Sequence, residues 1–371
     1  MRILITIDKF KGSLTSMQAS DAVKRGLRRS GSNAEIEVCP IADGGEGSTE
    51  VVIATLGGEW REAPAHDAQG RDIRARYGIV QRDGQREAIM EMSAASGLAM
   101  VSDLPLNPHQ ASTRGTGEMI RHALERGAQR ILIGIGGSAT NDGGCGMAAA
   151  LGFRFLDDAE HEIIDLPGEL ERVRRIDGTN RTQCEIIVAC DVTNPLLGEQ
   201  GATRTYGPQK GVQDVAFFES RLQHLADLVK RGLGCDHRDQ PGAGAAGGLG
   251  FGLMSFCGAR LQCGFDLVAD ITGLQDHINR ADIIITGEGK LDSQTLHGKG
   301  PAGVAAKGSA AGKRVVGIGG IIEENDALKK RFSLLIQVKP PDISVDEAIK
   351  RAAELLEECV ARNAHAIMES A

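Results

Sequence analysis

The stretch RILITIDKFKGSLT, residues 2–15, decides the fold class of this chain. It opens with a short apolar run that predicts a buried strand, and Asp8 then begins a polar loop. Thr15, followed three residues later by Gln18, has the capping-box pattern that predicts a helix running to about Arg29. A strand, a loop and a helix in this order are the repeating unit of a parallel α/β sheet.

The same order recurs along the chain, and further buried-strand runs are expected at residues 35–39, 130–134, 282–286, 314–318 and 334–338. Ser344 has the position of a cap for one final helix that includes Val360. We expect a doubly wound, Rossmann- or flavodoxin-like domain with a mostly parallel sheet of about six strands, built from residues 1–57, 109–149 and 280–371. A second α/β domain is expected to be inserted into it, from residues 58–108, with a hairpin at Asp83-Gly84, and 150–279.

The composition excludes several classes of protein. The 371 residues, 41% of them hydrophobic, suffice for about two domains. A formal net charge of −8 without a long basic run argues against nucleic acid as a partner. The eight cysteines form no C-x-x-C pair, which is typical of reduced thiols. No apolar run has the length of a signal peptide or a spanning helix, so we expect a cytoplasmic protein that handles metabolites.

The loop GIGGSATNDGG, residues 134–144, follows a predicted strand and contains the weak dinucleotide pattern G-x-G-x-x-A. Three consecutive polar residues among its glycines suit an anion site better, because backbone N–H groups and side-chain donors are both offered. A plain turn, in which Asn141 and Asp142 only cap the next helix, is the other interpretation. A second glycine-rich run, residues 241–250, either approaches a ligand or packs tightly between elements.

Acidic residues gather in three more loops, and each is a candidate general base or Mg²⁺ ligand as well as an ordinary turn residue. These loops hold Asp43 with Glu46, Asp191, and Glu288 with Lys290 and Asp292, the last followed by Lys299. Acids, lysines and glycines together favour phosphoryl transfer, which needs positioned charge and metal. The chain has no P-loop pattern, no H-E-x-x-H and no G-x-S-x-G, so P-loop, zinc-hydrolase and serine-hydrolase mechanisms lack support.

Seven ordered motifs resemble those of the type I bacterial glycerate kinase family, and the resemblance extends from residue 1 to about residue 340. The motifs are residues 8–15, 40–47, 134–144, 190–198, 206–211, 241–250 and 286–292. The resemblance implies phosphorylation of D-glycerate with ATP and Mg²⁺, in many members at the 2-hydroxyl, by two α/β domains with the active-site cleft between them. The chain departs from the family at Thr6-Ile7, where Ala-Pro is common, and at Cys145, where alanine is common.

The resemblance also gives each motif residue an expected role. The expected catalytic residues are Asp8, Lys11, Asp191 and Lys290, with Asp8 or Asp191 as the base. Substrate contacts are expected from Asp43, Gly44, Gly45, Glu46 and Asp292, and Mg²⁺ contacts from Asp191 and Asp292. Nucleotide contacts are expected from Gly136, Gly137, Ser138, Asn141, Asp142, Gly247, Gly248 and Glu288.

The expected partners are D-glycerate and ATP, without nucleic acid or membrane, and the expected assembly is a monomer or a homodimer. Three alternatives stay open: a kinase acting on the 3-hydroxyl, an NAD-dependent hydroxy-acid oxidoreductase, and a ligand sensor without activity. The oxidoreductase needs an acid about 20 residues after the glycine pattern, and Asp157 and Asp158 lie near that distance but in a polar turn.

Overall fold

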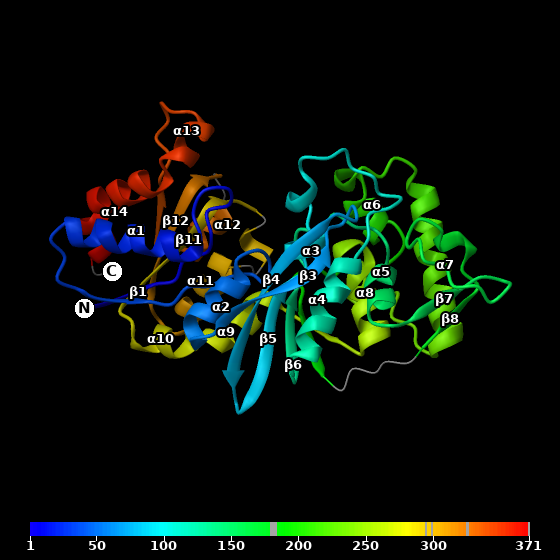
Figure 1. The fold of residues 1–371 in the computed structure, drawn as a ribbon. Helices are drawn as coiled ribbons and strands as arrows, with labels where there is room; N and C mark the ends of the chain where they lie inside the picture. The colour runs from blue at the N-terminus through cyan, green and yellow to red at the C-terminus, as the bar shows by residue number, and fades with distance from the viewer. Residues whose placement is uncertain (179–183, 294, 298–299, 324–325, 370–371) are drawn as a thin grey trace. The chain divides into compact units, whose positions relative to one another are not determined.

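The computed structural model describes residues 1–178, 184–293, 295–297, 300–323 and 326–369, so Lys299 lies outside the described residues. The chain divides into two compact units (Figure 1). Unit 1 comprises residues 1–43 and 265–371, and unit 2 is the continuous segment 44–264. Unit 2 is therefore inserted, in sequence, between the two parts of unit 1.

Unit 1 contains a fully parallel sheet of five strands in the order β13-β12-β11-β1-β2. The strands are β1 (Arg2–Ile5), β2 (Glu35–Val38), β11 (Ile283–Leu291), β12 (Arg314–Ile322) and β13 (Leu334–Gln337). Successive side chains of a strand point to opposite faces, so Ile3 and Ile5 enter one apolar core and Leu4 enters another. Both faces of the sheet are thus covered, as the sequence predicts for a doubly wound unit.

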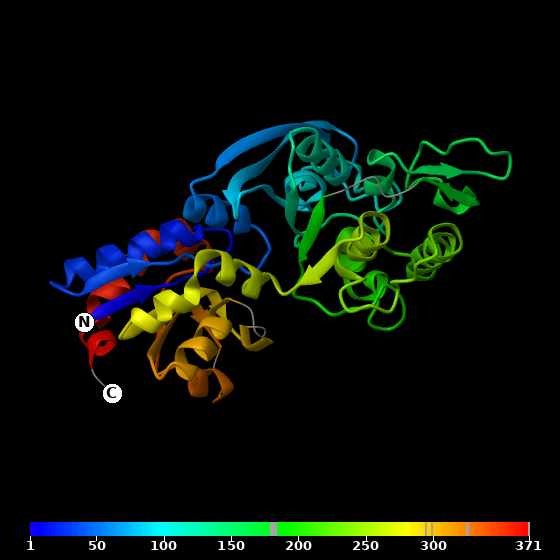
Figure 2. The same cartoon turned by 90° about the horizontal axis from the view of Figure 1, so that it is seen from below.

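The helices of unit 1 form a layer on each face of this sheet. Helices α1 and α14 lie together on one face, and the yellow and orange helices lie on the other (Figure 2). The helices are α1 (Ser16–Arg29), α9 (Gly264–Thr272), α10 (Leu274–Arg280), η4 (Thr295–His297), α11 (Gly300–Ala310), α12 (Asp326–Arg331), α13 (Val345–Lys350) and α14 (Ala352–Met368). The predicted capping box of α1 is present. The prediction of one helix after Ser344 is wrong, because Arg351 leaves the helical conformation between α13 and α14.

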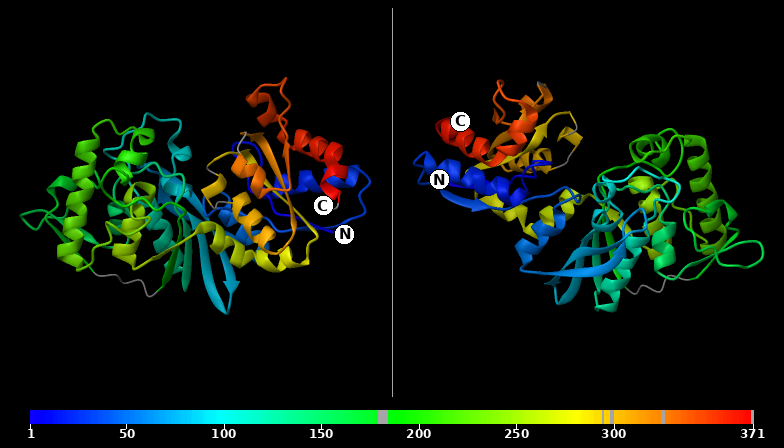
Figure 3. Two further views of the ribbon diagram at one scale, coloured as in Figure 1. Left: turned by 180° about the vertical axis from the view of Figure 1, so that it is seen from behind. Right: turned by 45° about the horizontal axis from the view of Figure 1, so that its top comes forward.

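Unit 2 contains a six-stranded sheet in the order β10-β9-β6-β5-β4-β3, parallel from β10 to β5 and antiparallel from β5 to β3 (Figure 3). The strands are β3 (Glu59–His66), β4 (Asp72–Arg82), β5 (Gln85–Glu91), β6 (Arg130–Gly134), β9 (Glu185–Ala189) and β10 (Arg260–Gln262), and β7 (Arg154–Leu156) pairs with β8 (Arg175–Asp177) separately. Asp83 and Gly84 both have positive φ, which confirms the predicted hairpin turn between β4 and β5.

One large apolar core lies between this sheet and the helices of unit 2. The helices are α2 (Ser48–Leu56), α3 (Ser93–Ser96), η1 (Ala99–Val101), α4 (Arg114–Glu125), α5 (Cys145–Ala150), η2 (Leu170–Arg172), α6 (Ala202–Tyr206), η3 (Pro208–Lys210), α7 (Val215–Leu233) and α8 (Ala245–Cys257). Asp214 caps α7, since its side chain accepts a hydrogen bond from the Phe217 N–H. Within the described part of the chain, no helix combines the length and apolar character needed to cross a membrane.

The prediction of a single sheet of six parallel strands is wrong. Strand β6 pairs with β5 and β9 in unit 2, so the central segment 109–149 belongs there and not with the terminal segments. Residues 44–57 also belong to unit 2, and residues 265–279 to unit 1, so the predicted boundaries differ from the observed division. Apolar periodicity indicates that a strand is buried, but it does not say which neighbour the strand joins.

Candidate active site

The predicted site residues divide between the two units. Unit 1 holds Asp8, Lys11, Asp43, Glu288, Lys290 and Asp292. Unit 2 holds Gly44, Gly45, Glu46, Gly136, Gly137, Ser138, Asn141, Asp142, Asp191, Gly247 and Gly248. In unit 1 these residues follow β1 and β2 or lie at the end of β11, and in unit 2 the loop of residues 135–144 follows β6 and Asp191 follows β9. These are carboxyl ends of parallel strands, the edge at which open α/β sheets bind ligands.

In unit 1, three acidic side chains come from three adjacent strands, because β1 pairs with β2 on one side and with β11 on the other. Asp8 follows β1, Asp43 follows β2, and Glu288 lies within β11. The Asp8 N–H donates to the carbonyl of Gly287 at 2.9 Å, which fixes the Asp8 loop to β11. The parallel order of strands therefore places these carboxyl groups within electrostatic range of one another.

Burial changes the acidity of two of these groups. Asp8 is 5% exposed, and its burial, reinforced by the charges of Asp43 and Glu288, raises its pKa to about 7 against the opposing effect of Lys9. The pKa of Glu288 is also raised to about 7, chiefly by burial and then by Asp43 and Asp292, although Thr295 donates a hydrogen bond to it at 2.8 Å. A carboxyl group with a pKa near neutrality suits proton transfer from a substrate hydroxyl.

The start of α11 lies directly against the Asp8 carboxyl group. A Cβ atom placed on Gly300, the first residue of this helix, would be 2.9 Å from Asp8 Oδ2, and Gly300 has a φ of +36°. Only glycine allows this approach without strain. The partial positive charge of the helix N-terminus therefore acts on the same carboxyl group.

Lysines are also present in unit 1, but they differ in their contacts. Lys9 Nζ lies 3.4 Å from Asp43 Oδ1, and the Lys9 N–H donates to Asp8 Oδ1 at 2.7 Å. Lys290 is half exposed and forms ion pairs with Asp292 at 3.2 Å and with Glu323 at 2.6 Å. Lys11 is exposed. Lys9, which is not among the site residues expected from the sequence, thus contacts Asp43 with its side chain and Asp8 with its backbone N–H.

The oxygen donors of unit 1 are of the kind that Mg²⁺ accepts. Among the described residues, no group of three or more histidine, cysteine or acidic side chains is placed to hold a metal. Mg²⁺ in phosphoryl-transfer sites is usually held by one or two carboxylates together with substrate phosphates, so a protein cage is not required. The half-buried Asp292 fits such a role, and its assignment as a ligand stays a prediction.

In unit 2, the loop of residues 135–144 leaves β6 beside the glycines that follow Asp43. A Cβ on Gly134 would be 2.2 Å from the Gly44 carbonyl, and one on Gly136 would be 3.3 Å from Gly45 Cα. Gly136 and Gly137 are exposed, whereas the residues from Ser138 to Asp142 are buried. The exposed backbone of this loop is therefore at the ligand-binding edge of the sheet, and its polar residues Ser138, Thr140, Asn141 and Asp142 are buried.

Asp142 holds this loop in shape. Its carboxylate is buried and accepts hydrogen bonds from the N–H and the hydroxyl of Thr113, at 2.9 and 2.8 Å, and from the N–H groups of Gly144 and Gly146. Burial raises its pKa against the effect of these four donors. Because the carboxylate is used within the chain, the turn interpretation of Asp142 is favoured over a nucleotide contact.

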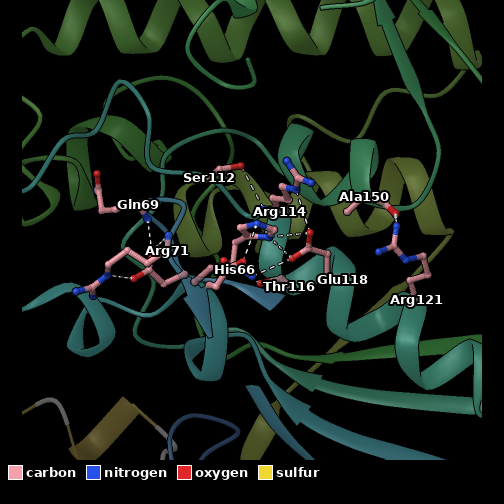
Figure 4. A network of polar contacts seen from close by, with 12 residues as sticks. His66, Gln69, Arg71, Ser112, Arg114, Thr116, Glu118, Arg121 and Ala150 are labelled. Atoms are coloured by element: carbon pink, nitrogen blue, oxygen red, sulfur yellow. Dashed lines mark hydrogen bonds and ion pairs between the residues drawn. The ribbon is translucent and has the colours of Figure 1, made fainter. Parts of the chain in front are cut away.

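The residue that Asp142 contacts, Thr113, directly precedes α4, and α4 is fixed to β3 by a second set of polar contacts. His66 Nδ1 lies 2.9 Å from Glu118 Oε2, and Arg114 Nε donates to Glu118 Oε1 at 3.0 Å (Figure 4). These hydrogen bonds hold the pKa of Glu118 below its ordinary value although burial opposes them. These contacts fix the start of α4, and with it Thr113, which holds the Asp142 carboxylate of the loop.

A buried lysine, Lys210, forms hydrogen bonds to two residues of this loop. Lys210 Nζ donates to Ser138 Oγ at 2.6 Å and to the Thr140 carbonyl at 2.7 Å. Burial lowers the pKa of Lys210 to about 7, and the charge of Asp142 acts in the opposite direction. Two buried side-chain oxygens of the same loop, Thr140 Oγ1 and Asn141 Oδ1, have no hydrogen-bond partner among the described residues.

The glycine-rich run at the start of α8 packs against this loop. Ala246, Gly247 and Gly248 have left-handed φ values, and a Cβ on Gly247 would be only 1.9 Å from the Thr140 carbonyl oxygen. Gly247 O also accepts a hydrogen bond from the Gly143 N–H at 3.0 Å. Both glycines are buried, so the packing interpretation of this run is favoured over the predicted phosphate contact.

Asp191 follows β9 and is tied to the segment that ends unit 2. Its Oδ1 accepts a hydrogen bond from the Gly264 N–H at 2.8 Å and lies 3.2 Å from Cys263 Sγ. Glu46 is exposed. The catalytic and metal-binding roles expected of Asp191 and the substrate role of Glu46 stay predictions.

Comparison with known proteins shows the family to which the chain belongs. The family model described as the glycerate kinase family matches residues 3–368. The chain belongs to this family. It is 44% identical over 364 residues to the glycerate 2-kinase of Escherichia coli (strain K12), covering 95% of this chain and 94% of that protein. It is 40% identical to the glycerate kinase of Bacillus subtilis (strain 168), covering 96% and 95%.

A solved structure of this glycerate kinase family also matches. It is a crystal structure described as a glycerate kinase 2 from Salmonella typhimurium LT2, with a TM-score of 0.86, 38% sequence identity and coverage of 99% of this chain and 98% of that one. The α/β fold class is thereby confirmed. Lys9 and Lys210 are not among the site residues expected from the sequence, but both lie inside motifs that carry the resemblance to the family, and those motifs are the sequence signal for them.

Proposed function

We propose that this protein transfers the γ-phosphate of ATP to the 2-hydroxyl group of D-glycerate, which yields 2-phosphoglycerate and ADP. Membership of the glycerate kinase family supports a kinase acting on glycerate. The observation that carries the mechanism is the buried Asp8 carboxyl group, whose pKa is raised to about 7. Similarity to a glycerate 2-kinase supports the 2-hydroxyl as acceptor.

The chemical step places the acceptor hydroxyl beside Asp8. The hydroxyl oxygen forms a bond to the γ-phosphorus in line with the breaking bond to the ADP oxygen, and the hydroxyl proton passes to an Asp8 carboxylate oxygen. We select Asp8 over Asp191 as the base because burial brings the pKa of Asp8 to about 7. Lys9 and Lys11 supply positive charge in the same loop.

The exposed backbone of Gly136 and Gly137, with Ser138, is proposed to bind phosphate oxygens of the nucleotide. When bound, Mg²⁺ would neutralise charge on the transferred group, with Asp292 as its proposed carboxylate ligand. We propose that Asp142 and the Gly247-Gly248 pair act on the nucleotide only through the shape of this loop.

The direct test is ³¹P NMR of the product formed from D-glycerate, ATP and Mg²⁺. A signal of 2-phosphoglycerate is expected. A signal of 3-phosphoglycerate would keep the kinase and contradict the choice of hydroxyl, and the absence of any product would contradict the proposed function. L-glycerate is the matched control substrate, because it carries the same groups in mirror-image arrangement.

Replacement of Asp8 by asparagine tests the base. We expect Asp8→Asn to lower kcat about 10²- to 10⁴-fold with little change in either KM, since the amide keeps the size of the side chain but accepts no proton. Asp21→Asn, an exposed position on α1 in the same unit, is the control and should keep full activity. A kcat near that of the wild type in Asp8→Asn would exclude Asp8 as the base.

A further inference from the structure

Lys210 is a buried cation with an unusual pair of partners. Its side chain is 2% exposed, whereas lysine is almost never fully buried in proteins. Its two contacts both go to the loop of residues 135–144, one to Ser138 Oγ and one to the Thr140 carbonyl. In its ammonium form the Lys210 side chain has three donors and no acceptor, so in that form Lys210 donates both hydrogen bonds.

This direction determines what the Ser138 hydroxyl can do. Ser138 Oγ accepts the bond from Lys210, so its own proton is left to be donated elsewhere. Over the residues that the structure describes, Ser138 Oγ has no acceptor for this proton. Ser138 directly follows Gly136 and Gly137, the exposed part of the loop. The hydroxyl proton is therefore available to a ligand that reaches the exposed backbone.

We propose that Lys210 is a positioning residue, which orients the Ser138 hydroxyl as a hydrogen-bond donor to an oxyanion of a bound substrate. This inference rests on the proposed function, in which the loop binds an anionic reactant. The ligand chemistry is a phosphate or carboxylate oxygen, because such oxygens accept hydrogen bonds and carry no proton of their own.

The charge state of Lys210 is coupled to the same ligand. Burial favours the neutral amine, and Asp142 is the charged group that counteracts it. An anion held by Ser138 adds a second negative charge close to Lys210 and favours the ammonium form. Binding of the anion and protonation of Lys210 therefore stabilise each other.

A double-mutant cycle tests the proposal. We expect Ser138→Ala to lower kcat/KM about 10- to 100-fold, the effect of losing a hydrogen bond to a charged group, and Ser138→Thr to retain most of the activity because it keeps a hydroxyl. Lys210→Met should cause a similar loss in the wild-type background but less than about a 3-fold further loss in Ser138→Ala, because its effect passes through Ser138.

Which of the two KM values rises in Ser138→Ala, that for ATP or that for D-glycerate, identifies the oxyanion. A rise in the KM for ATP assigns a nucleotide phosphate to Ser138, and a rise in the KM for D-glycerate assigns the substrate carboxylate; either supports the positioning role. Lys230→Met, an exposed lysine of α7, is the control and should behave as the wild type. Full activity of Ser138→Ala, or an undiminished effect of Lys210→Met in the Ser138→Ala background, would overturn the proposal.

Two further measurements keep the test decisive. If Lys210→Met does not fold, the comparison of Ser138→Ala with Ser138→Thr decides, and equal activity in the two variants counts against the proposal. If the wild-type protein does not phosphorylate glycerate, calorimetric titration with a non-hydrolysable ATP analogue replaces the kinetic assay. Weaker binding in Ser138→Ala would then support the role of Ser138 although the proposed function fails, and unchanged binding of both the analogue and D-glycerate, titrated in the same way, would overturn that role.

Discussion

Replacement of Asp8 by asparagine should make the protein more stable above pH 7, where the buried Asp8 carboxylate of the wild type is charged. The pKa of Asp8 rises from an ordinary 3.8 to about 7 in the folded chain. Between these two values the native state holds a proton that the unfolded chain has released, so the free energy of unfolding falls as the pH rises through this range. Above pH 7 the full cost of the buried carboxylate is present.

The size of this cost follows from the shift. A shift of about three units at about 1.4 kcal/mol per unit corresponds to about 4 kcal/mol at pH 8 and to almost nothing below pH 4. Asparagine carries no charge at either pH, so Asp8→Asn should unfold at a higher temperature than the wild type at pH 8, by roughly 10 °C for a unit of this size.

Scanning calorimetry at pH 8 and at pH 4 measures both values, and Asp21→Asn again serves as the control. A melting temperature of Asp8→Asn at or below that of the wild type at pH 8 would refute the reasoning. So would a gain of equal size at pH 4, because the gain would then not come from ionisation of Asp8. Loss of turnover together with a gain in stability would show that the site maintains a costly charge for its chemistry.

Three further changes test other parts of the structure. Glu288→Gln removes a negative charge that raises the pKa of Asp8, so the acid limb of the profile of kcat/KM against pH should move to lower pH. An unchanged or higher midpoint of that limb would contradict the coupling of the two carboxyl groups. Gly247→Ala should lower the free energy of unfolding of unit 2 in urea by more than about 3 kcal/mol, since its Cβ would be 1.9 Å from the Thr140 carbonyl oxygen. Gly234→Ala, at the end of α7, is the control: it has a similar φ but open space around it, and should cost only about 1–2 kcal/mol. Asp191→Asn should abolish turnover and leave ATP affinity intact in calorimetry if Asp191 serves the reaction, and unchanged turnover would exclude that role.

The sequence predicts the elements of this fold better than their assembly. Periodicity located β1, β11 and β12, and the capping box placed the start of α1, because these signals are local. The partners of β6 were not predictable in this way, since its apolar run would suit either sheet. Which sheet a buried strand joins depends on contacts between residues that are far apart in the chain.

The candidate site shows the same limit. The sequence indicates Asp8 and the loop of residues 135–144, because polar loops after buried strands are recognisable. The sequence does not decide whether the Asp142 carboxylate holds the turn or binds a ligand, because capping and ligand binding use the same residue types. The sequence does not indicate Lys210 as a site residue, since the neighbouring residues of a lysine do not predict that its side chain will be buried. Its partners come from a segment about 70 residues earlier.

The interrupted sequence of unit 1 has a consequence for synthesis on the ribosome. Strand β1 sits between β2 and β11, but β11 is translated only after the whole of unit 2. At a translation rate of 5–20 residues per second, roughly ten to fifty seconds pass between the synthesis of β1 and that of its second neighbour, β11. Unit 2, being continuous, can complete its sheet during that time. Until then Ile3, Leu4 and Ile5 of β1, which are buried in the finished sheet, lack their β11 neighbour, and the early chain is a candidate client for chaperones that shield exposed apolar segments.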